Sequence, residues 1–522
     1  MNNLIPRPNF FKHKEGQFIV DKSVGVTSCE QFKEVKLLLE NLISKSIGST
    51  LQGEKGIEII CEPTLDVEAY AIKVTPTLIT LSASTVRGAI WGLQTLRQIA
   101  NLDFSHKSSI ILNCFQLKDK PRFSYRGLHF DIARHFFDKL EIMRLIDLAS
   151  RVKINVLHLH LSDDQGWRMQ IDGYPELTNN SACVINYAKS NRQEQDGKVS
   201  CGFLTKQDLK EIIAYAQKLG VDIMPEIDFP GHTQALLMAM PELSCESKQI
   251  SLWESWGVSK HILCAGNVKV YKVLEDIFSQ VCELFPYPYI HIGGDEAPKD
   301  EWKKCSKCKA KLNELGLANY EQLQSYMFNY IEKFLQSRGK IVVGWNECLS
   351  DKLSNSVVVE HWTSRLMRSR QDTIKHINRG RKAIIAYFTS TYLDYSYAMT
   401  PISRVYNFNP IFKGITKQGE KNVLGMECCV WTEHIPNRKK LDFNLFPRLY
   451  AFAENAWSGS TDYAQFVARL QNYYHTLDVL GVEYARGYEF KGRNLVTAMK
   501  ALAKDAYCEF NKQQNAQIKE KK

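Results

Sequence analysis

The sequence predicts an α/β protein, a (β/α)8 TIM barrel preceded by a small α+β domain. From about residue 120 onward, a helical pattern is followed repeatedly by a short apolar run that ends in polar or acidic residues. Eight such runs occur, which is the strand number of that barrel. We therefore expect an N-terminal domain at 1–118, the barrel at 119–490, and a helical extension with a polar tail at 491–522.

The N-terminal domain is predicted from alternating residues. The runs GIEIICE, AYAIKV and LITLSA alternate between apolar and polar positions, as half-buried strands do. One helix-like segment, TVRGAIWGLQTLRQIA, follows them. Strands followed by a helix indicate a small α+β domain.

The repeating unit of the barrel is clearest at residues 205–228. Thr205 and Asp208 form a capping pattern, apolar residues share one helical face, a glycine ends the helix, and a strand follows. Asp138 and Glu141 resemble a second capping box. The eight strand candidates are GLHFDIAR, INVLHLHL, VDIMPEID, YIHIGGD, IVVGW, SVVVEHW, AIIAYF and VLGMECCVW.

Charge and hydropathy exclude several classes of protein. The 67 basic and 57 acidic residues give a net charge of +10 that is spread along the chain, without a module that reads nucleic acid. No apolar stretch is long enough for a membrane span. The start, MNNLIPRPNFFKHKEG, lacks the apolar core of a signal peptide, which leaves a cytoplasmic protein or one whose leader has been removed.

The cysteine pattern predicts neither a disulfide framework nor a metal site. The chain has 14 cysteines without the spacing of small secreted scaffolds. Cys305 and Cys308 form a CxxC, but no second pair lies nearby in the sequence to complete a tetrahedral zinc site. Free, mostly packed thiols are expected, with no metal and no cofactor.

Two adjacent carboxylates, Asp295 and Glu296, follow two glycines in HIGGDE, at the end of the fourth strand candidate. Glycine lets the pleat break there, so neighbouring side chains need not face opposite sides. Paired carboxylates in different environments are what acid/base cleavage of a glycosidic bond requires. A polar turn is the alternative interpretation of this motif alone.

His232 in PEIDFPGHT and Asp163 in HLHLSDDQGWR end the third and second strand candidates, so both can converge with Glu296 as a proton-handling chain. A capping role for Asp163 is the alternative. The histidines of HLH and the following aspartates also leave a metal-dependent hydrolase open. His158 and His160 share one strand face, however, and are expected to pack within the barrel.

Aromatic and hydrogen-bonding residues surround these groups in the predicted barrel. Trp345, Trp362 and Trp431 fall at the ends of strand candidates five, six and eight, which favours a carbohydrate site because sugars present apolar C–H faces. Arg126 near the first strand offers a donor fork for vicinal hydroxyls, and Asp394, close to Tyr392, can accept from them. An ion pair at the barrel end is the alternative for Arg126 and Asp394.

Together these motifs resemble those of the family 20 glycoside hydrolases, the β-N-acetylhexosaminidases. YRGLHFDIARHFF, NVLHLHLSDDQGWR, PEIDFPGHT, HIGGDEAPK, GWNE, YLDY and CCVWTE are similar to the barrel motifs of that family in order, and EAYAIKV and GAIWGLQTL to its N-terminal domain. The resemblance implies an exo-acting, retaining enzyme that removes terminal β-linked GlcNAc or GalNAc from glycans or chitooligosaccharides, in a periplasmic, secreted or cytoplasmic setting.

The resemblance also implies roles. Glu296 is the general acid/base, and Asp295 orients the substrate's 2-acetamido group, whose oxygen attacks the anomeric carbon to give an oxazolinium intermediate, a route outside the usual two-carboxylate scheme. Further implied roles are support of Glu296 by Asp163 and His232, hydroxyl binding by Arg126, Asp394 and Glu433, an acetamido donor in Tyr392, and a methyl box of Trp345, Trp362 and Trp431.

One departure from the family pattern and two alternatives remain. YLDYSYAMTPISRVYNFNP lacks the further tryptophan that some members carry, and Tyr406 or Phe408 is the candidate replacement. A disaccharide-releasing member would need a pocket extended beyond the terminal sugar, which Arg126 and Asp394 would close. An inactive sugar-binding protein is the second alternative, against which the intact Asp295 and Glu296 argue.

Overall fold

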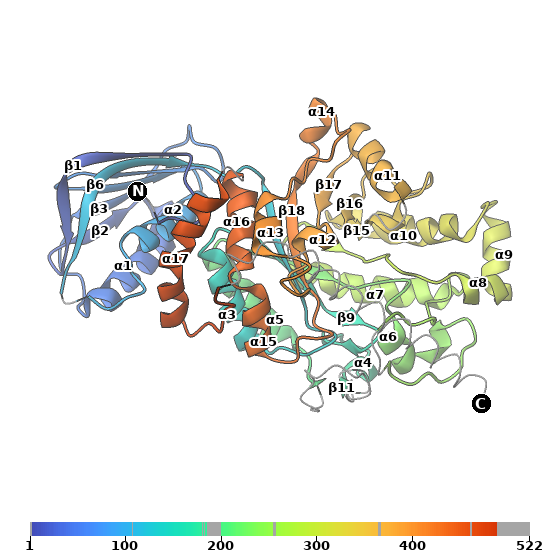
Figure 1. The fold of residues 1–522 in the computed structure, drawn as a ribbon. Helices are drawn as coiled ribbons and strands as arrows, with labels where there is room; N and C mark the ends of the chain where they lie inside the picture. Colours follow the sequence, from blue (N-terminus) through green and yellow to red (C-terminus); the bar gives the residue numbers. More distant parts are fainter. Residues whose placement is uncertain are drawn as a thin grey trace.

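The computed structural model describes residues 3–106, 108–179, 181, 183–184, 200–253, 257–363, 367–459 and 462–487. A six-stranded sheet with two helices forms one end of the molecule, and a closed eight-stranded barrel with surrounding helices follows it (Figure 1). The predicted fold class is confirmed. The expected polar tail at 491–522 lies outside the described residues.

The N-terminal sheet has the strand order β1-β6-β4-β5-β3-β2. The three predicted alternating runs are β3, β4 and β5, and the predicted helix is α2, whose cap Thr85 accepts from the N–H of Gly88. The two helices bury their apolar faces with one face of the sheet. The elements are β1 (Phe10–Val20), β2 (Gly25–Ser28), α1 (Lys33–Ile47), β3 (Gly56–Cys61), β4 (Tyr70–Val74), β5 (Ile79–Ala83), α2 (Val86–Ile99) and β6 (Ile110–Asp119).

The barrel closes through eight parallel strands, and all eight predicted segments contribute one. The last strand pairs with the first from Gly425 opposite Tyr125 to Val430 opposite Phe130, which removes every free edge. The strands are β7 (Tyr125–Asp131), β8 (Val156–His160), β13 (Asp222–Glu226), β14 (Tyr289–His291), β15 (Ile341–Trp345), β16 (Val358–His361), β17 (Ala383–Ile385) and β18 (Val423–Val430).

Helices cover the outside of the barrel, and both predicted caps are present. Asp138 accepts from the N–H of Glu141, and Thr205 and Asp208 form a reciprocal capping box. One connection differs from the prediction, because β15 and β16 are joined by a short 3-10 helix, η3 (Asn346–Cys348), and no α-helix. The longer helices are α3 (Lys139–Ser150), α5 (Lys206–Lys218), α7 (Val268–Leu284), α9 (Ser306–Glu314), α10 (Tyr320–Gln336), α11 (Met367–Asn378), α15 (Arg438–Leu445), α16 (Arg448–Ser458) and α17 (Tyr463–Val479). The shorter ones are α4 (Glu176–Asn179), α6 (Gln234–Ala239), α8 (Asp300–Lys304), α12 (Phe388–Thr391), α13 (Ile402–Asn407) and α14 (Lys417–Glu420).

The barrel interior is layered. Apolar side chains, among them Val156, Met224 and Val343, fill the end where the strands begin. A buried layer of histidines and glutamates lies above them, and the predicted packing of His158 and His160 inside the barrel holds, since both are buried beside Glu226. Large aromatic residues form the layer at the mouth. This apolar layer closes the end of the barrel where the strands begin, so the interior opens toward the mouth, where the strands end.

Arg126 lies at the opposite end of the barrel from the mouth, so its predicted place in the site is wrong. It is the second residue of β7, and its guanidinium pairs with Glu68 of the N-terminal domain. Nη1 and Nε donate to the carbonyls of Phe123 and Lys153 at 2.7 and 2.8 Å, and the group lies over the ring of Trp457. The alternative of a barrel-end ion pair is the correct one.

The cysteines also differ from the prediction. Cys201 is disulfide-bonded rather than free. The fold brings Cys245 and Cys264 against the Cys305–Cys308 pair, so the expectation that this CxxC lacks two further thiol neighbours is wrong. The sequence distance between the two pairs hid this cluster.

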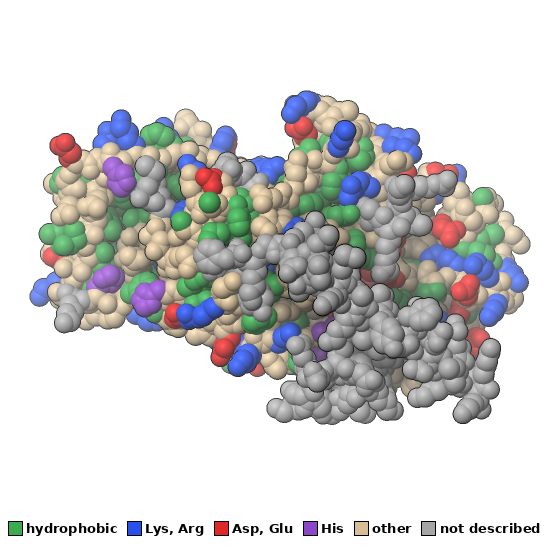
Figure 2. Space-filling model, in the orientation of Figure 1, with side chains coloured by type: hydrophobic (Ala, Val, Ile, Leu, Met, Phe, Trp, Pro, Cys, Tyr) green, Lys and Arg blue, Asp and Glu red, His purple; other side chains and the backbone are tan. Residues whose placement is uncertain are grey.

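The surface carries mixed charge. Lys and Arg side chains are distributed over the visible face and alternate with Asp and Glu (Figure 2). Within the described ranges, no helix is long and apolar enough to cross a membrane.

Candidate active site at the barrel mouth

The HIGGDE loop leaves β14 through two glycines in the left-handed region, Gly293 with φ +65 and Gly294 with φ +100. A Cβ at Gly293 would lie 1.7 Å from Oδ1 of Asp228, so only glycine fits this crossing. The carbonyl of Gly293 accepts from the N–H of Trp345 at 2.9 Å, and the N–H of Gly294 donates to Asp228 at 3.0 Å. The loop is therefore held on both sides.

Both carboxylates of this loop reach His232. Nε2 of His232 lies 3.5 Å from Oδ2 of Asp295 and 3.9 Å from Oε2 of Glu296. Glu296 itself has a positive φ of 42, which breaks the alternation expected of adjacent strand residues. The predicted convergence of these groups on one side of the mouth is thus present in the structure.

His232 continues the chain of contacts to Asp163. Its Nδ1 lies 3.1 Å from Oδ1 of Asp163 and 3.5 Å from Oδ2 of Asp164. Burial opposes the charged imidazole, but the Asp163 and Asp295 carboxylates raise the pKa of His232 well above its usual value. The ring therefore lies between two carboxylates that favour its protonated form.

Arg134 is the last residue in this series of contacts. Asp131 at the end of β7 accepts from the backbone N–H of Ala133 and Arg134, which turns the chain back over the mouth. Nη2 of Arg134 then lies 2.7 Å from Oδ2 of Asp163. Burial disfavours the Asp163 carboxylate, but Arg134 and His232 hold its pKa well below the usual range.

Asp295 and Asp228 form a buried carboxyl pair. Burial, the Glu296 carboxylate and the Glu226 carboxylate raise the pKa of Asp295 to about 6, although the charge of His232 opposes this. Burial and Asp295 raise the pKa of Asp228 well above its usual value, which favours the protonated form, the one that can donate to Asp295. Among the described residues, Oδ1 of Asp295 is buried without a hydrogen-bond partner.

An aromatic cluster, Trp345, Trp362, Tyr392 and Trp431, lies at the mouth. Ring centroids are 6.0 Å apart for Trp345 and Trp431, 6.3 Å for Tyr392 and Trp431, and 6.2 Å for Trp362 and Tyr392, which are nearly parallel at 18°. The four residues come from the ends of β15, β16 and β18 and the segment after α12. Together they make a small aromatic-walled site.

Polar partners fix two rings of the cluster. The indole N–H of Trp345 donates to Glu226 at 2.9 Å, and that of Trp362 donates to Glu347 at 2.7 Å. Glu226 also contacts His291 at 2.8 Å, within the histidine layer below. A buried Trp needs such an acceptor for its N–H, so Glu226 sets the orientation of Trp345.

Asp394 and Glu433 lie near Trp431 and Arg134. Arg134 is 4.0 Å from Oε1 of Glu433 and lies 4.9 Å above the Trp431 ring. Burial and the Glu433 charge raise the pKa of Asp394 to about 8. Arg134 thus lies between two carboxylates of the mouth, Asp163 and Glu433.

Family models match nearly the whole described chain. The catalytic-domain model of glycosyl hydrolase family 20 matches residues 123–460, and the model of domain 2 of the same family matches residues 1–119. The chain belongs to glycoside hydrolase family 20. It is therefore a glycoside hydrolase by family, as its motifs predict.

Known relatives agree with this membership. The chain is 33% identical to the β-hexosaminidase of Porphyromonas gingivalis over 512 residues, which cover 92% of this chain and 64% of that protein. It is 32% identical to the β-hexosaminidase of Vibrio furnissii, covering 86% and 76%. Among solved structures, the family 20 exo-β-N-acetylglucosaminidase of Vibrio harveyi in complex with N-acetylglucosamine has a TM-score of 0.83 at 29% identity, covering 94% and 79%.

The structure of this family 20 hydrolase brings together every predicted site residue except Arg126. Sequence reasoning missed Arg134, Glu226, Asp228 and Glu347, although Arg134 and Asp228 end predicted strands, Glu347 follows one, and Glu226 lies two residues before the end of one. Position at a strand end was the available signal. Of the two candidates to replace the missing tryptophan, Tyr406 is fully buried against Tyr463 and Phe466, and Phe408 stacks on Tyr387.

We expect Gly293→Ala to lower kcat/KM by about 100-fold or more, because the clash with Asp228 must shift the loop that carries Asp295, and shifts near 1 Å cost that much. Gly316→Ala is the matched control, since Gly316 also has a positive φ of 59 but has open space around it. Steady-state kinetics on a chromogenic N-acetylglucosaminide checks this. Equal activities in the two variants would contradict the role given to the crossing.

Proposed function

We propose that this chain is an exo-acting, retaining β-N-acetylhexosaminidase that removes terminal β-linked GlcNAc or GalNAc. The observation that carries the proposal is Oδ1 of Asp295, a buried acceptor without a partner in the described structure, beside a cluster of four aromatic rings. A secondary amide with a methyl group fits such a site, because its N–H needs an acceptor and its methyl needs apolar walls.

The first step uses the substrate's own amide. Asp295 accepts the amide N–H and stabilises the positive charge that develops as the carbonyl oxygen attacks the anomeric carbon. Tyr392, buried beside Trp431, donates its O–H to that oxygen. Glu296 gives its proton to the leaving oxygen, so the C–O bond breaks and an oxazolinium forms.

The second step reverses the proton transfer. Glu296, now ionised, takes a proton from water, which attacks the anomeric carbon and opens the oxazolinium with overall retention. His232 lies 3.9 Å from Glu296 and stays positively charged between Asp163 and Asp295, so it supports the ionised form of Glu296. Asp163 and Arg134 hold the imidazolium in place.

The remaining polar groups close the pocket around one sugar. Arg134, Asp394 and Glu433 lie beside Trp431 of the aromatic cluster, where they can bind the 3-, 4- and 6-hydroxyls of a terminal sugar. Arg134 takes the hydroxyl-binding role that was predicted for Arg126. A pocket closed on this side supports exo action over release of disaccharides.

We expect Asp295→Asn and Glu296→Gln each to lower kcat by about 100-fold or more on a chromogenic β-N-acetylglucosaminide, because a charge-stabilising or proton-transferring group is lost. Exposed Glu314→Gln is the control. Wild-type enzyme should release single sugars with retained configuration, seen by NMR, and leave the matching β-glucoside uncut. Inverted product, or equal turnover of the glucoside, would overturn substrate assistance.

The two arginines give a separate test. Arg134→Lys is expected to lower kcat/KM by about 10-fold or more, because a lysine lacks the guanidinium fork that can bridge Asp163 and sugar hydroxyls. Arg126→Lys is expected to leave KM unchanged and to lower the thermal unfolding midpoint, since Arg126 joins the two domains. Kinetics and thermal melts of both variants check this, and a raised KM in Arg126→Lys alone would restore the original assignment.

The pH profile follows from Asp295. Its pKa is raised to about 6 and its ionised form is the active one, so kcat/KM should fall as the pH drops through about 6. His232→Gln removes the positive charge that favours ionised Asp295, so the acidic limb should move to higher pH. His475→Gln, at an exposed position, should leave the limb in place. A limb that stays fixed in His232→Gln would contradict the coupling.

A further inference from the structure

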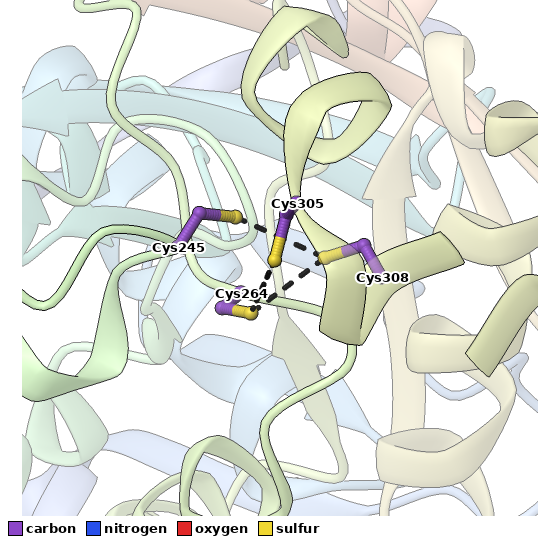
Figure 3. Close-up of side chains that lie close together, drawn as sticks. All are labelled: Cys245, Cys264, Cys305 and Cys308. Atoms are coloured by element: carbon purple, nitrogen blue, oxygen red, sulfur yellow. Dashed lines mark hydrogen bonds between the residues drawn. The ribbon is translucent and has the colours of Figure 1, made fainter. Parts of the chain in front are cut away.

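We propose that Cys245, Cys264, Cys305 and Cys308 bind one structural zinc ion. The four side chains point toward a common centre, two from loops and two from the α8–α9 corner (Figure 3). Cys245 follows a 3-10 turn at Pro241–Leu243, Cys264 precedes α7, Cys305 lies between α8 and α9, and Cys308 is in the first turn of α9. None of them belongs to the proposed active site.

The sulfur positions have the size of a tetrathiolate site. The sulfur atoms are 3.8 Å apart for Cys245 and Cys308, 3.8 Å for Cys264 and Cys305, and 3.6 Å for Cys264 and Cys308. All ligand atoms lie within 4.8 Å of one another. Zinc–sulfur bonds of about 2.3 Å in tetrahedral geometry separate the sulfurs by about 3.8 Å.

The same distances argue against two disulfides. Cys264 lies 3.8 Å from Cys305 and 3.6 Å from Cys308, and Cys308 lies 3.8 Å from Cys245, so no sulfur has one neighbour much nearer than the next. A disulfide pairs one sulfur with one other at about 2.05 Å, which would make the spacing unequal. Sulfurs shared evenly among neighbours are typical of a common central ion.

The backbone around the sulfurs is built for thiolates. The N–H of Gly266 donates to the sulfurs of Cys264 and Cys308. A Cβ at Gly266 would lie 2.2 Å from the carbonyl group of Lys307, so glycine permits the close approach. The indole N–H of Trp302 donates to the carbonyl of Leu263 at 2.8 Å and ties α8 to the same loop. Such outer contacts orient metal ligands.

Charge and chemistry select zinc. A divalent ion with four thiolates carries two negative charges, and the surrounding segment, residues 303–311, supplies five lysines in KKCSKCKAK. Soft sulfur ligands in a tetrahedral arrangement favour zinc over magnesium or calcium. Binding releases the four thiol protons to solvent and involves no electron transfer.

The ion would join two segments that carry catalytic groups. Cys245 and Cys264 lie in the connection after β13, which holds His232, and Cys305 and Cys308 lie in the connection after β14, which holds Asp295 and Glu296. Bonds of a structural zinc site contribute folding energy directly. The ion is thus a brace that fixes one catalytic connection to the other.

Metal analysis of the full-length protein, purified under reducing conditions, tests the site. Wild-type protein and Cys282→Ser, a control cysteine outside the cluster, should each carry one zinc per chain by elemental analysis and native mass spectrometry. Cys308→Ser and the partly exposed Cys245→Ser should lose it and melt at a lower temperature. Cobalt added to metal-free wild type should give the visible absorption of a tetrahedral thiolate site.

Three results would overturn the proposal. These are two disulfides among the four cysteines by peptide mapping without reductant, iron in place of zinc, or a metal-free reduced wild type that fails to take up zinc or cobalt. Metal content is measured without substrate, so the outcome is independent of the proposed hydrolase activity. Wild-type measurements decide the matter even where a serine variant fails to fold.

Discussion

The mouth of this barrel depends on how it accommodates buried carboxyl groups that lie within a few ångströms of one another. Asp163, Asp228 and Asp295 are all buried there, and uncompensated burial of several negative charges is prohibitively costly. The chain divides them by partner. Asp163 faces Arg134 and His232, which lower its pKa, whereas Asp228 faces Asp295, which together with burial raises the pKa of Asp228. The pKa of Asp295, about 6, lies between those of Asp163 and Asp228, so a bound substrate can change its ionisation.

The layer of histidines and glutamates beneath the mouth also contains a buried carboxylate that its neighbours stabilise. Glu226 contacts His158, His160 and His291, so its pKa is held low although burial opposes this. Its Oε1, which contacts His291, also accepts the indole N–H of Trp345. His160 also contacts Asp163 at 2.7 Å, which joins the two layers. The orientation of an aromatic wall and the charge of the proton-handling chain therefore rest on one buried network.

Patterns of neighbouring residues predicted the features of the structure that depend on neighbouring residues. The eight barrel strands, three strands of the N-terminal sheet, the helix caps at Asp138 and Thr205 and the polar strand ends could be predicted from local patterns, because these depend on neighbours in sequence. Arg126 was misplaced for a physical reason: it is the second residue of β7, at the end of the barrel where the strands begin, whereas Arg134 follows the last residue of that strand, Asp131, at the mouth. The pattern showed a strand but not where it begins. The cysteine cluster was missed because its pairs meet only through packing of two separate connections.

Those two connections are in contact at more than one place, which explains why glycines recur in them. Near the barrel, a Cβ at Gly231 would lie 3.1 Å from the carbonyl oxygen of Asp295, and farther out Gly266 meets Lys307. At Gly266 the two backbones approach more closely than a side chain allows, and at Gly231 a Cβ would make a tight contact. Direct backbone contact therefore fixes the distance between His232 and the Asp295–Glu296 pair. A metal ion that joins the outer ends of the two connections would help to hold the same distance.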